Sequence, residues 1–225
     1  MVTSKVSKAA KEKADQLCQE GLDYYTHWDI ERAIEAFKSA ITLNNQEADC
    51  FLHLAQAYVR VGDYEHMRKA LGEFLHREHD PVLTDRFEML FGNAMDDVET
   101  LFTHIMTQRD VPLEIIGAAM LMWVEFRVAS GRRHITLGGS EARAWAAALD
   151  YTVRKVNFHE APLEYISRWY EVSPQVVRSR HATLVEILDV MPCDYRYFRG
   201  LENPLDKLVE AASMLEELEE RFYRL

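Results

Sequence analysis

The sequence predicts an all-α protein, and its composition and two of its patterns carry this prediction. Of the 225 residues, 48% are apolar and 28% are charged, while Gly and Pro number only 9 and 6. This balance disfavours turn-rich β folds and disordered low-complexity chains. Apolar residues recur at helical spacing over long stretches, and one internal period is typical of stacked helical hairpins. The length fits one or two ordinary domains.

An internal period of 34 residues relates residues 14–47 to the segment that follows them. Small or apolar residues recur in both copies: Leu17 with Phe51, Gly21 with Ala55, Tyr24 with Tyr58, Ala33 with Met67, Phe37 with Leu71, and Ala40 with Phe74. This period predicts two helical hairpins with turns at residues 26–29 and 62–63. Gly21 and Ala55 would let the two helices of each hairpin approach closely.

On these residues the sequence resembles the tetratricopeptide repeat family. The resemblance implies a short solenoid over residues 1–110, with two clear repeats and a degenerate third over residues 83–110. The sequence departs from the family at Asn44 and Asn45, where the unit usually ends with Pro, and at Met67, where Ala is usual. Because a helical hairpin cannot bury its apolar face alone, the C-terminal half is expected to cap the repeats.

Residues 111–200 predict a second helical domain without the 34-residue period. Residues 113–130 are apolar nearly all round, the pattern of a buried central helix, and Gly131 ends it. A loop over residues 131–139 leads to Ser140, the predicted N-cap of a helix over residues 141–156. The last segment, residues 201–225, contains an acidic amphipathic helix over residues 204–223 that we expect to act as a cap.

A helix-turn-helix is predicted between residues 163 and 190. A short helix over residues 163–170 is followed by a turn at residues 171–172, and then Ser173 and Pro174 start a long helix. With the Ala-rich helix before it, this stretch resembles the C-terminal module of certain bacterial repeat proteins. That module is itself similar to the cyclin-like domain of transcription factor B cores. The sequence departs from it at Ser167, where Ala is favoured, and at Glu171, where Gly is usual.

The net charge and the cysteine content indicate which partners and which cellular compartment to expect. The net charge of −11 comes from 26 basic and 37 acidic residues, which disfavours broad binding to nucleic acid. The helix-turn-helix domain, residues 111–200, is nearly neutral with 11 basic and 10 acidic residues. Three irregularly spaced cysteines, and no apolar leader or bilayer-length segment, predict a soluble protein of the reducing cytoplasm.

The tetratricopeptide resemblance implies a concave groove lined by the first helix of each repeat. It places these residues towards a protein or peptide partner: Cys18, Leu22, Tyr25, His53, Gln56 and Arg60. The Lys and Asn residues with which some members clamp a terminal carboxylate are missing here. The groove could equally be filled by the chain's own C-terminal half or by a second copy in a homo-oligomer.

The helix-turn-helix offers a second candidate surface. If it reads DNA, the exposed start of its second helix would face base edges, and nearby basic residues would lie at phosphates. The base-edge candidates are Gln175, Arg178 and Ser179, and the phosphate candidates are Arg154, Lys155, Arg168 and Arg180. The alternative is that the motif serves only as a packing unit, because these residues form no basic cluster.

The sequence contains few residue patterns that could indicate catalysis or metal binding. Cys50 and His53 share one helix face, but no second pair at ligand spacing is visible. The chain has no Gly-rich phosphate loop and no metalloprotease or nucleophile-elbow motif. We therefore expect no catalytic residues, no metal site and no cofactor. The leading hypothesis is a non-enzymatic adaptor that binds a protein through the repeat groove, and the alternative is a DNA-binding transcriptional regulator.

Overall fold

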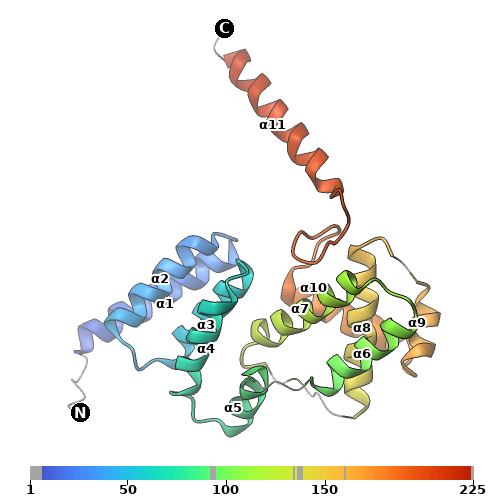
Figure 1. Cartoon of the computed structure of the whole chain (residues 1–225). Helices are drawn as coiled ribbons and strands as arrows, with labels where there is room; N and C mark the ends of the chain where they lie inside the picture. The colour runs from blue at the N-terminus through green and yellow to red at the C-terminus, as the bar shows by residue number, and fades with distance from the viewer. Residues whose placement is uncertain (1–6, 92–94, 134, 136–138, 160, 224–225) are drawn as a thin grey trace. The chain divides into compact units, whose positions relative to one another are not determined.

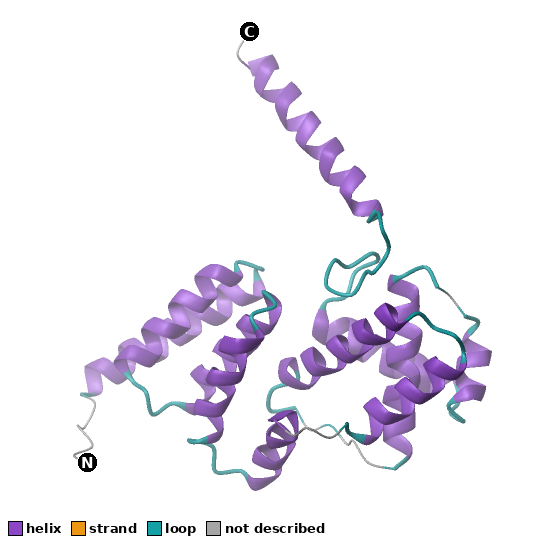
Figure 2. Ribbon diagram, in the orientation of Figure 1, coloured by secondary structure: helices purple, strands orange, loops and turns teal. Residues whose placement is uncertain are grey.

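A computed structural model describes residues 7–91, 95–133, 135, 139–159 and 161–223, with the side chains of the last seven of these left out. Within these ranges every regular element is a helix, which confirms the predicted all-α class (Figure 2). The chain forms two compact units. Unit 1 comprises Met1–Ala94 with Val124–Ile135, and unit 2 comprises Met95–Trp123 with Thr136–Leu225. Helix α7 therefore contributes residues to both units.

Unit 1 contains two consecutive helical hairpins. Its helices are α1 (Lys8–Thr26), α2 (Ile30–Leu43), α3 (Ala48–Arg60), α4 (Tyr64–Leu75) and α5 (Pro81–Glu88), followed by a 3₁₀ turn (Met89–Phe91). Helices α1 and α2 lie side by side, as do α3 and α4 (Figure 1). The side chains of Ser7, Asp29, Asp63 and Asp80 each cap a helix by accepting a hydrogen bond from a backbone amide.

The tightest packing in the first hairpin is between Gly21 of α1 and Phe37 of α2. A Cβ atom on Gly21 would lie 2.5 Å from Cε1 of Phe37, so only glycine fits there. Phe37 is fully buried, as is Ala55, the residue at the equivalent position of the second hairpin. The close approach inferred from the period is thus present in the first hairpin.

The helices of the expected third repeat do not form one hairpin. Helix α5 belongs to unit 1, and helix α6 (Asp97–Gln108) belongs to unit 2. In place of a third repeat, the end of α7 (Leu113–Ala129) completes unit 1, with Val128 in the same apolar core as Leu52 and Phe87. The first unit therefore ends near residue 94 and regains residues 124–135, whereas we expected a continuous domain over residues 1–110.

Unit 2 is arranged around helix α8 (Ser140–Val156). Helices α6, α9 (Leu163–Trp169) and α10 (Pro174–Leu188) all pack against α8, which presents a run of buried alanines to them. Small residues allow this close crossing of helices. Helix α8 begins at Ser140 itself, one residue before the predicted start, and neither Ser140 nor Gly139 caps it with a side chain.

The boundary between α9 and α10 lies where the sequence predicts it. Ser173 accepts a hydrogen bond from the amide of Val176 at 3.3 Å, and Pro174 occupies the first helical position. Glu171 lies in the turn with φ of 55°, the left-handed conformation that favours glycine. Glu171, where the resemblance leads one to expect Gly, therefore lies at a position with positive φ.

The last helix, α11 (Pro204–Tyr223), has the predicted bounds but does not behave as a cap. Leu208, Val209, Met214 and Leu215 are exposed, from 57% for Val209 to 68% for Met214, whereas Leu205 in the first turn is half-buried. Tyr195 donates a hydrogen bond to Asp206 at 2.8 Å and fixes the start of the helix. The apolar face of α11 is thus left exposed, in contrast to the predicted packing role.

We expect Gly21→Ala to destabilise the protein by about 1–3 kcal/mol, because the added methyl overlaps a phenyl ring that is fully buried. Gly72→Ala is the matched control. Gly72 lies in helix α4 with open space around it, so alanine there should stabilise by about 0.5–1 kcal/mol. Urea unfolding of both variants measures the difference, and equal stabilities would refute the close approach.

We expect Glu171→Gly to stabilise unit 2 by about 0.5–1 kcal/mol, because it relieves a positive φ that costs a side-chain-bearing residue about 1–2 kcal/mol. Glu171→Gln serves as the control. It keeps the strained backbone and removes only the exposed ion pair with Arg143, so its stability should stay within about 0.5 kcal/mol of the parent. A glycine variant no more stable than the glutamine variant would disprove backbone strain at this turn.

Candidate functional site

The predicted groove residues all lie on helices α1 and α3 of unit 1, which pack against each other. We call the surface formed by these two helices the α1/α3 face. Leu22 and Tyr25 of α1, and His53, Gln56 and Arg60 of α3, are partly exposed on it. The 34-residue register places equivalent positions of the two hairpins on neighbouring helices, which is why residues so far apart in sequence gather here.

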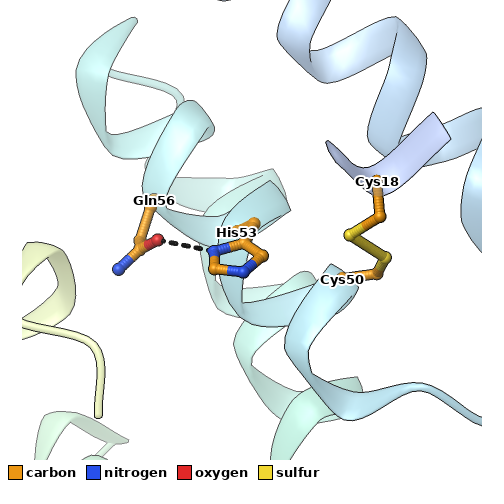
Figure 3. Close-up of a disulfide and its surroundings, with 4 residues drawn as sticks. All are labelled: Cys18, Cys50, His53 and Gln56. Atoms are coloured by element: carbon orange, nitrogen blue, oxygen red, sulfur yellow. Dashed lines mark hydrogen bonds between the residues drawn. A yellow bond between two sulfur atoms is a disulfide. The ribbon is translucent and has the colours of Figure 1, made fainter. Parts of the chain in front are cut away.

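A disulfide between Cys18 and Cys50 joins the two helices of this face (Figure 3). Their Cα atoms are 6.1 Å apart, within the normal range for a disulfide. The pairing was not predicted from the sequence. The location of the protein in the reducing cytoplasm stays a prediction. The disulfide takes Cys18 out of the set of groups free to contact a partner.

Part of the α1/α3 face is filled by the chain itself. The amide of Gln56 donates hydrogen bonds to the carbonyls of Val128 and Ala129 at 3.3 and 3.2 Å. A Cβ on Gly131, whose φ is 54°, would lie 2.9 Å from Gln56 Nε2. His53 Nδ1 lies 3.1 Å from Gln56 Oε1 and helps to orient that amide (Figure 3). The end of α7 and the residues that follow it, 128–132, thus occupy the Gln56 side of the face.

Charged side chains hold this segment in place. Arg132 is 2.7 Å from Asp49 and 2.5 Å from Glu78, and Arg86 donates to the carbonyls of Gly131 and Arg133. Burial by itself would raise the pKa of Glu78. Hydrogen bonds from two backbone amides and from Arg132 lower it by more than burial raises it, so the pKa lies below its ordinary value. Glu78 therefore stays ionised and keeps Arg132 paired.

The other end of the face, with the turn after α1, carries a partly exposed cluster that we call the aromatic–arginine cluster: Tyr25, Trp28 and Arg60. Arg60 Nε donates to the Tyr25 hydroxyl at 3.0 Å, and its guanidinium carbon lies 4.6 Å from the centre of the Trp28 ring. Trp28 is 49% exposed, in a turn with φ of 62°. Trp28 was missed in the sequence because it lies between helices and has no aromatic counterpart in the second hairpin. The signal in the sequence was a Trp at the predicted turn of residues 26–29.

Unit 1 also has an apolar hollow of about 460 Å³ on another side, between helices α2, α3 and α4. Its floor includes Ile41, Leu54 and Tyr58, and Lys38 and Lys69 stand at its edge. The sequence reasoning missed it because the resemblance directed attention to the first helices of the repeats.

The predicted DNA-contacting residues do not form one surface. Gln175, Arg178 and Ser179 are exposed near the start of α10, and Lys155 and Arg168 are also exposed. Arg154, by contrast, is buried and paired with Asp150, so it does not share an exposed surface with these residues. Arg180 is 2.6 Å from Glu141 and lies over the Trp145 ring. Two of the predicted phosphate contacts are therefore engaged inside the protein.

The pairing of Arg154 belongs to a buried polar network in unit 2. Asp150 accepts hydrogen bonds from Arg154 Nε and, at 3.0 Å, from the Tyr170 hydroxyl. Burial raises the pKa of Asp150 and raises that of Tyr170 well above its ordinary value. This network joins α8 to the turn between α9 and α10.

Other chemistry has little support among the described residues. In that part of the chain no group of three or more His, Cys, Asp and Glu could hold a metal ion. Cys50 is in the disulfide, so the Cys50–His53 pair is not available as a ligand pair. Cys193 is a buried free thiol. No helix of the described chain is long and apolar enough to cross a membrane.

No known protein family, curated protein or solved structure matches the chain. The tetratricopeptide and cyclin-like resemblances therefore rest on the quoted residues alone. Any proposal about function therefore depends on the contacts in the structure itself.

We expect the protein to bind random-sequence duplex DNA with a Kd no tighter than about 10⁻⁴ M at physiological salt. The net charge of −11 repels a polyanion, and Arg154 and Arg180 are occupied internally. Fluorescence anisotropy with a labelled duplex at two salt concentrations measures this affinity. Micromolar binding that weakens steeply with salt, and that Arg178→Ala abolishes, would contradict the prediction and favour the DNA-binding alternative.

Proposed function

We propose that the protein is a non-enzymatic interaction module that binds a partner protein through the aromatic–arginine cluster. The observation that carries this proposal is the exposed Trp28 ring, held between its turn and the guanidinium of Arg60. Trp, Tyr and Arg are the residue types that contribute most binding energy at protein interfaces. Single exposed apolar residues are common, but this cluster combines all three types on one face.

The cluster is ordered before any partner binds. Tyr25 and Trp28 hold the guanidinium of Arg60 in one place, and the Cys18–Cys50 disulfide ties α1 to α3. A surface fixed in advance loses less side-chain entropy on association, which favours affinity. The partner we expect presents an apolar side chain to the indole and a carboxylate to the guanidinium.

The segment of residues 128–132 limits where this partner can lie. It covers the Gln56 side of the α1/α3 face, so the partner's contact begins at Tyr25 and Arg60 and extends over the turn. A peptide along the whole groove, as the family resemblance implies, would have to displace this segment. The expected interface is therefore at the turn end of the first two hairpins.

The alternative function, a DNA-binding transcriptional regulator, is favoured by one observation. Gln175, Arg178 and Ser179 are exposed near the start of α10, where a reading helix would present its side chains. The interaction function is preferred because the cluster in unit 1 is complete, whereas the basic residues of unit 2 are dispersed or paired.

The test is quantitative affinity purification from the cells that make the protein, comparing the parent with Trp28→Asn and Arg60→Gln. Asn tolerates the left-handed turn, so Trp28→Asn removes the ring with little backbone cost. We expect both variants to lose the same partner by at least about tenfold, because Trp and Arg are typical hot-spot residues. The retained protein is then purified and titrated directly.

The matched control is Phe158→Asn, which also replaces an exposed aromatic residue at positive φ but lies in unit 2. It should retain the partner at the parental level. If every captured protein survives both cluster variants, or is lost equally with the control, the proposed surface is wrong.

A further inference from the structure

Unit 2 contains a polar cavity that neither candidate function uses. Its volume is about 330 Å³, and it is lined by Tyr151, Arg154, Lys155, Ala161, Pro162 and Leu163. These residues come from the last turns of α8 and from the segment that begins α9. Helix α8 therefore forms one wall of the cavity, and the proline-containing segment of residues 161–163 forms another.

Arg154 in the cavity wall has a hydrogen-bonding group without a partner. Its side chain is 5% exposed, and its Nε is paired with the carboxylate of Asp150. The Nη2 atom is buried and makes no hydrogen bond within the described chain. A buried donor left unpaired is costly, and such atoms are rare in folded proteins. The guanidinium is thus built into the wall with donor capacity to spare.

The charges around the cavity favour an anion. Asp150 neutralises one positive charge, that of Arg154, and it is further held by the Tyr170 hydroxyl. Lys155, the next residue, is exposed and lies 5.3 Å from the centre of the Tyr151 ring. Lys155 forms no ion pair with any described residue. Together these three charged groups leave an excess of one positive charge at the cavity.

We propose that this cavity binds the oxyanion group, phosphate or carboxylate, of a small molecule. The guanidinium of Arg154 and the ammonium of Lys155 supply charge-assisted hydrogen bonds to the oxyanion. The ring of Tyr151 and the side chains of Pro162 and Leu163 offer apolar surface to the organic part of the ligand. The volume exceeds what a free inorganic ion needs, so a ligand with both parts fits best.

The buried network positions the guanidinium for this role. Asp150 is held between Arg154 Nε and the Tyr170 hydroxyl, so the fork cannot rotate away from the wall. The guanidinium carbon also lies 5.5 Å from the centre of the Trp169 ring. Because these contacts exist before binding, little side-chain order has to be gained when the ligand enters.

The test uses isothermal titration calorimetry of the full chain with three probes that share one benzene ring: phenyl phosphate, benzoate and phenol. We expect saturable binding of at least one of the two anions, with a Kd of about 1 mM or tighter, and none of phenol. The stronger of the two anions identifies the oxyanion as phosphate or carboxylate. Amide NMR spectra should show the largest shifts at Tyr151, Lys155 and Leu163.

Lys155→Gln is the decisive variant, because Lys155 is exposed and its replacement leaves the buried network intact. It should weaken anion binding about tenfold, the loss expected for one charge-assisted hydrogen bond. Arg178→Gln removes the same charge from an exposed position of α10 that does not line the cavity, and it should leave the affinity unchanged. Arg154→Lys keeps the charge but loses the fork, and circular dichroism establishes that it is folded before it is titrated.

Three results would each overturn the proposal. The first is the absence of saturable binding by either anion at millimolar concentration. The second is binding of phenol as strong as that of the anions, which would make the cavity a general apolar site. The third is an equal loss of affinity in Lys155→Gln and Arg178→Gln, which would reduce the effect to the overall charge of the molecule.

Discussion

Burial of helix α7 on nearly every side is the constraint on which both units depend. A helix that is apolar all round has to be covered all round, and no single helical hairpin can do this. The chain meets the demand by dividing α7 between its two units: residues up to Trp123 belong to unit 2, and Val124–Ile135 belong to unit 1. Val128 then completes the core that the two N-terminal hairpins leave open.

This burial brings charged groups inside, and the structure satisfies them with specific partners. Glu125 and Arg127 of α7 are both buried; Tyr64 donates to Glu125 at 3.0 Å, and Arg127 donates to the carbonyl of Arg86 at 3.2 Å. Hydrogen bonds between buried groups disfavour any other register of α7 against its neighbours in unit 1, because a shifted helix would leave these groups without their partners. Burial also disfavours the charged form of Arg86. Its pKa is lowered by that burial and by the positive charge of the nearby Arg127.

The sequence predicted what local patterns control and missed what long-range pairing controls. The period of 34 gave the two hairpins, and Ser173 with Pro174 gave the start of α10, because caps and turns act over a few residues. The burial of Arg154 was not predictable, since it depends on Asp150 together with a tyrosine from beyond α9. The Cys18–Cys50 bond was missed for a similar reason: its two helices belong to different hairpins and are brought together by tertiary packing. In the candidate site, Tyr25 and Arg60 were identified, but Trp28 lay outside any repeated position.

The net charge of −11 and a cavity suited to an oxyanion are compatible, because they act over different distances. At physiological ionic strength, charges farther apart than about 8 Å are largely screened. The global charge therefore affects how fast an anion approaches more than how tightly it is held, whereas Arg154 and Lys155 act at contact distance. A polyanion such as DNA cannot exploit this difference: it extends over the whole surface and meets all the acidic groups at once. The same charge distribution thus disfavours a long anion and leaves room for a small one.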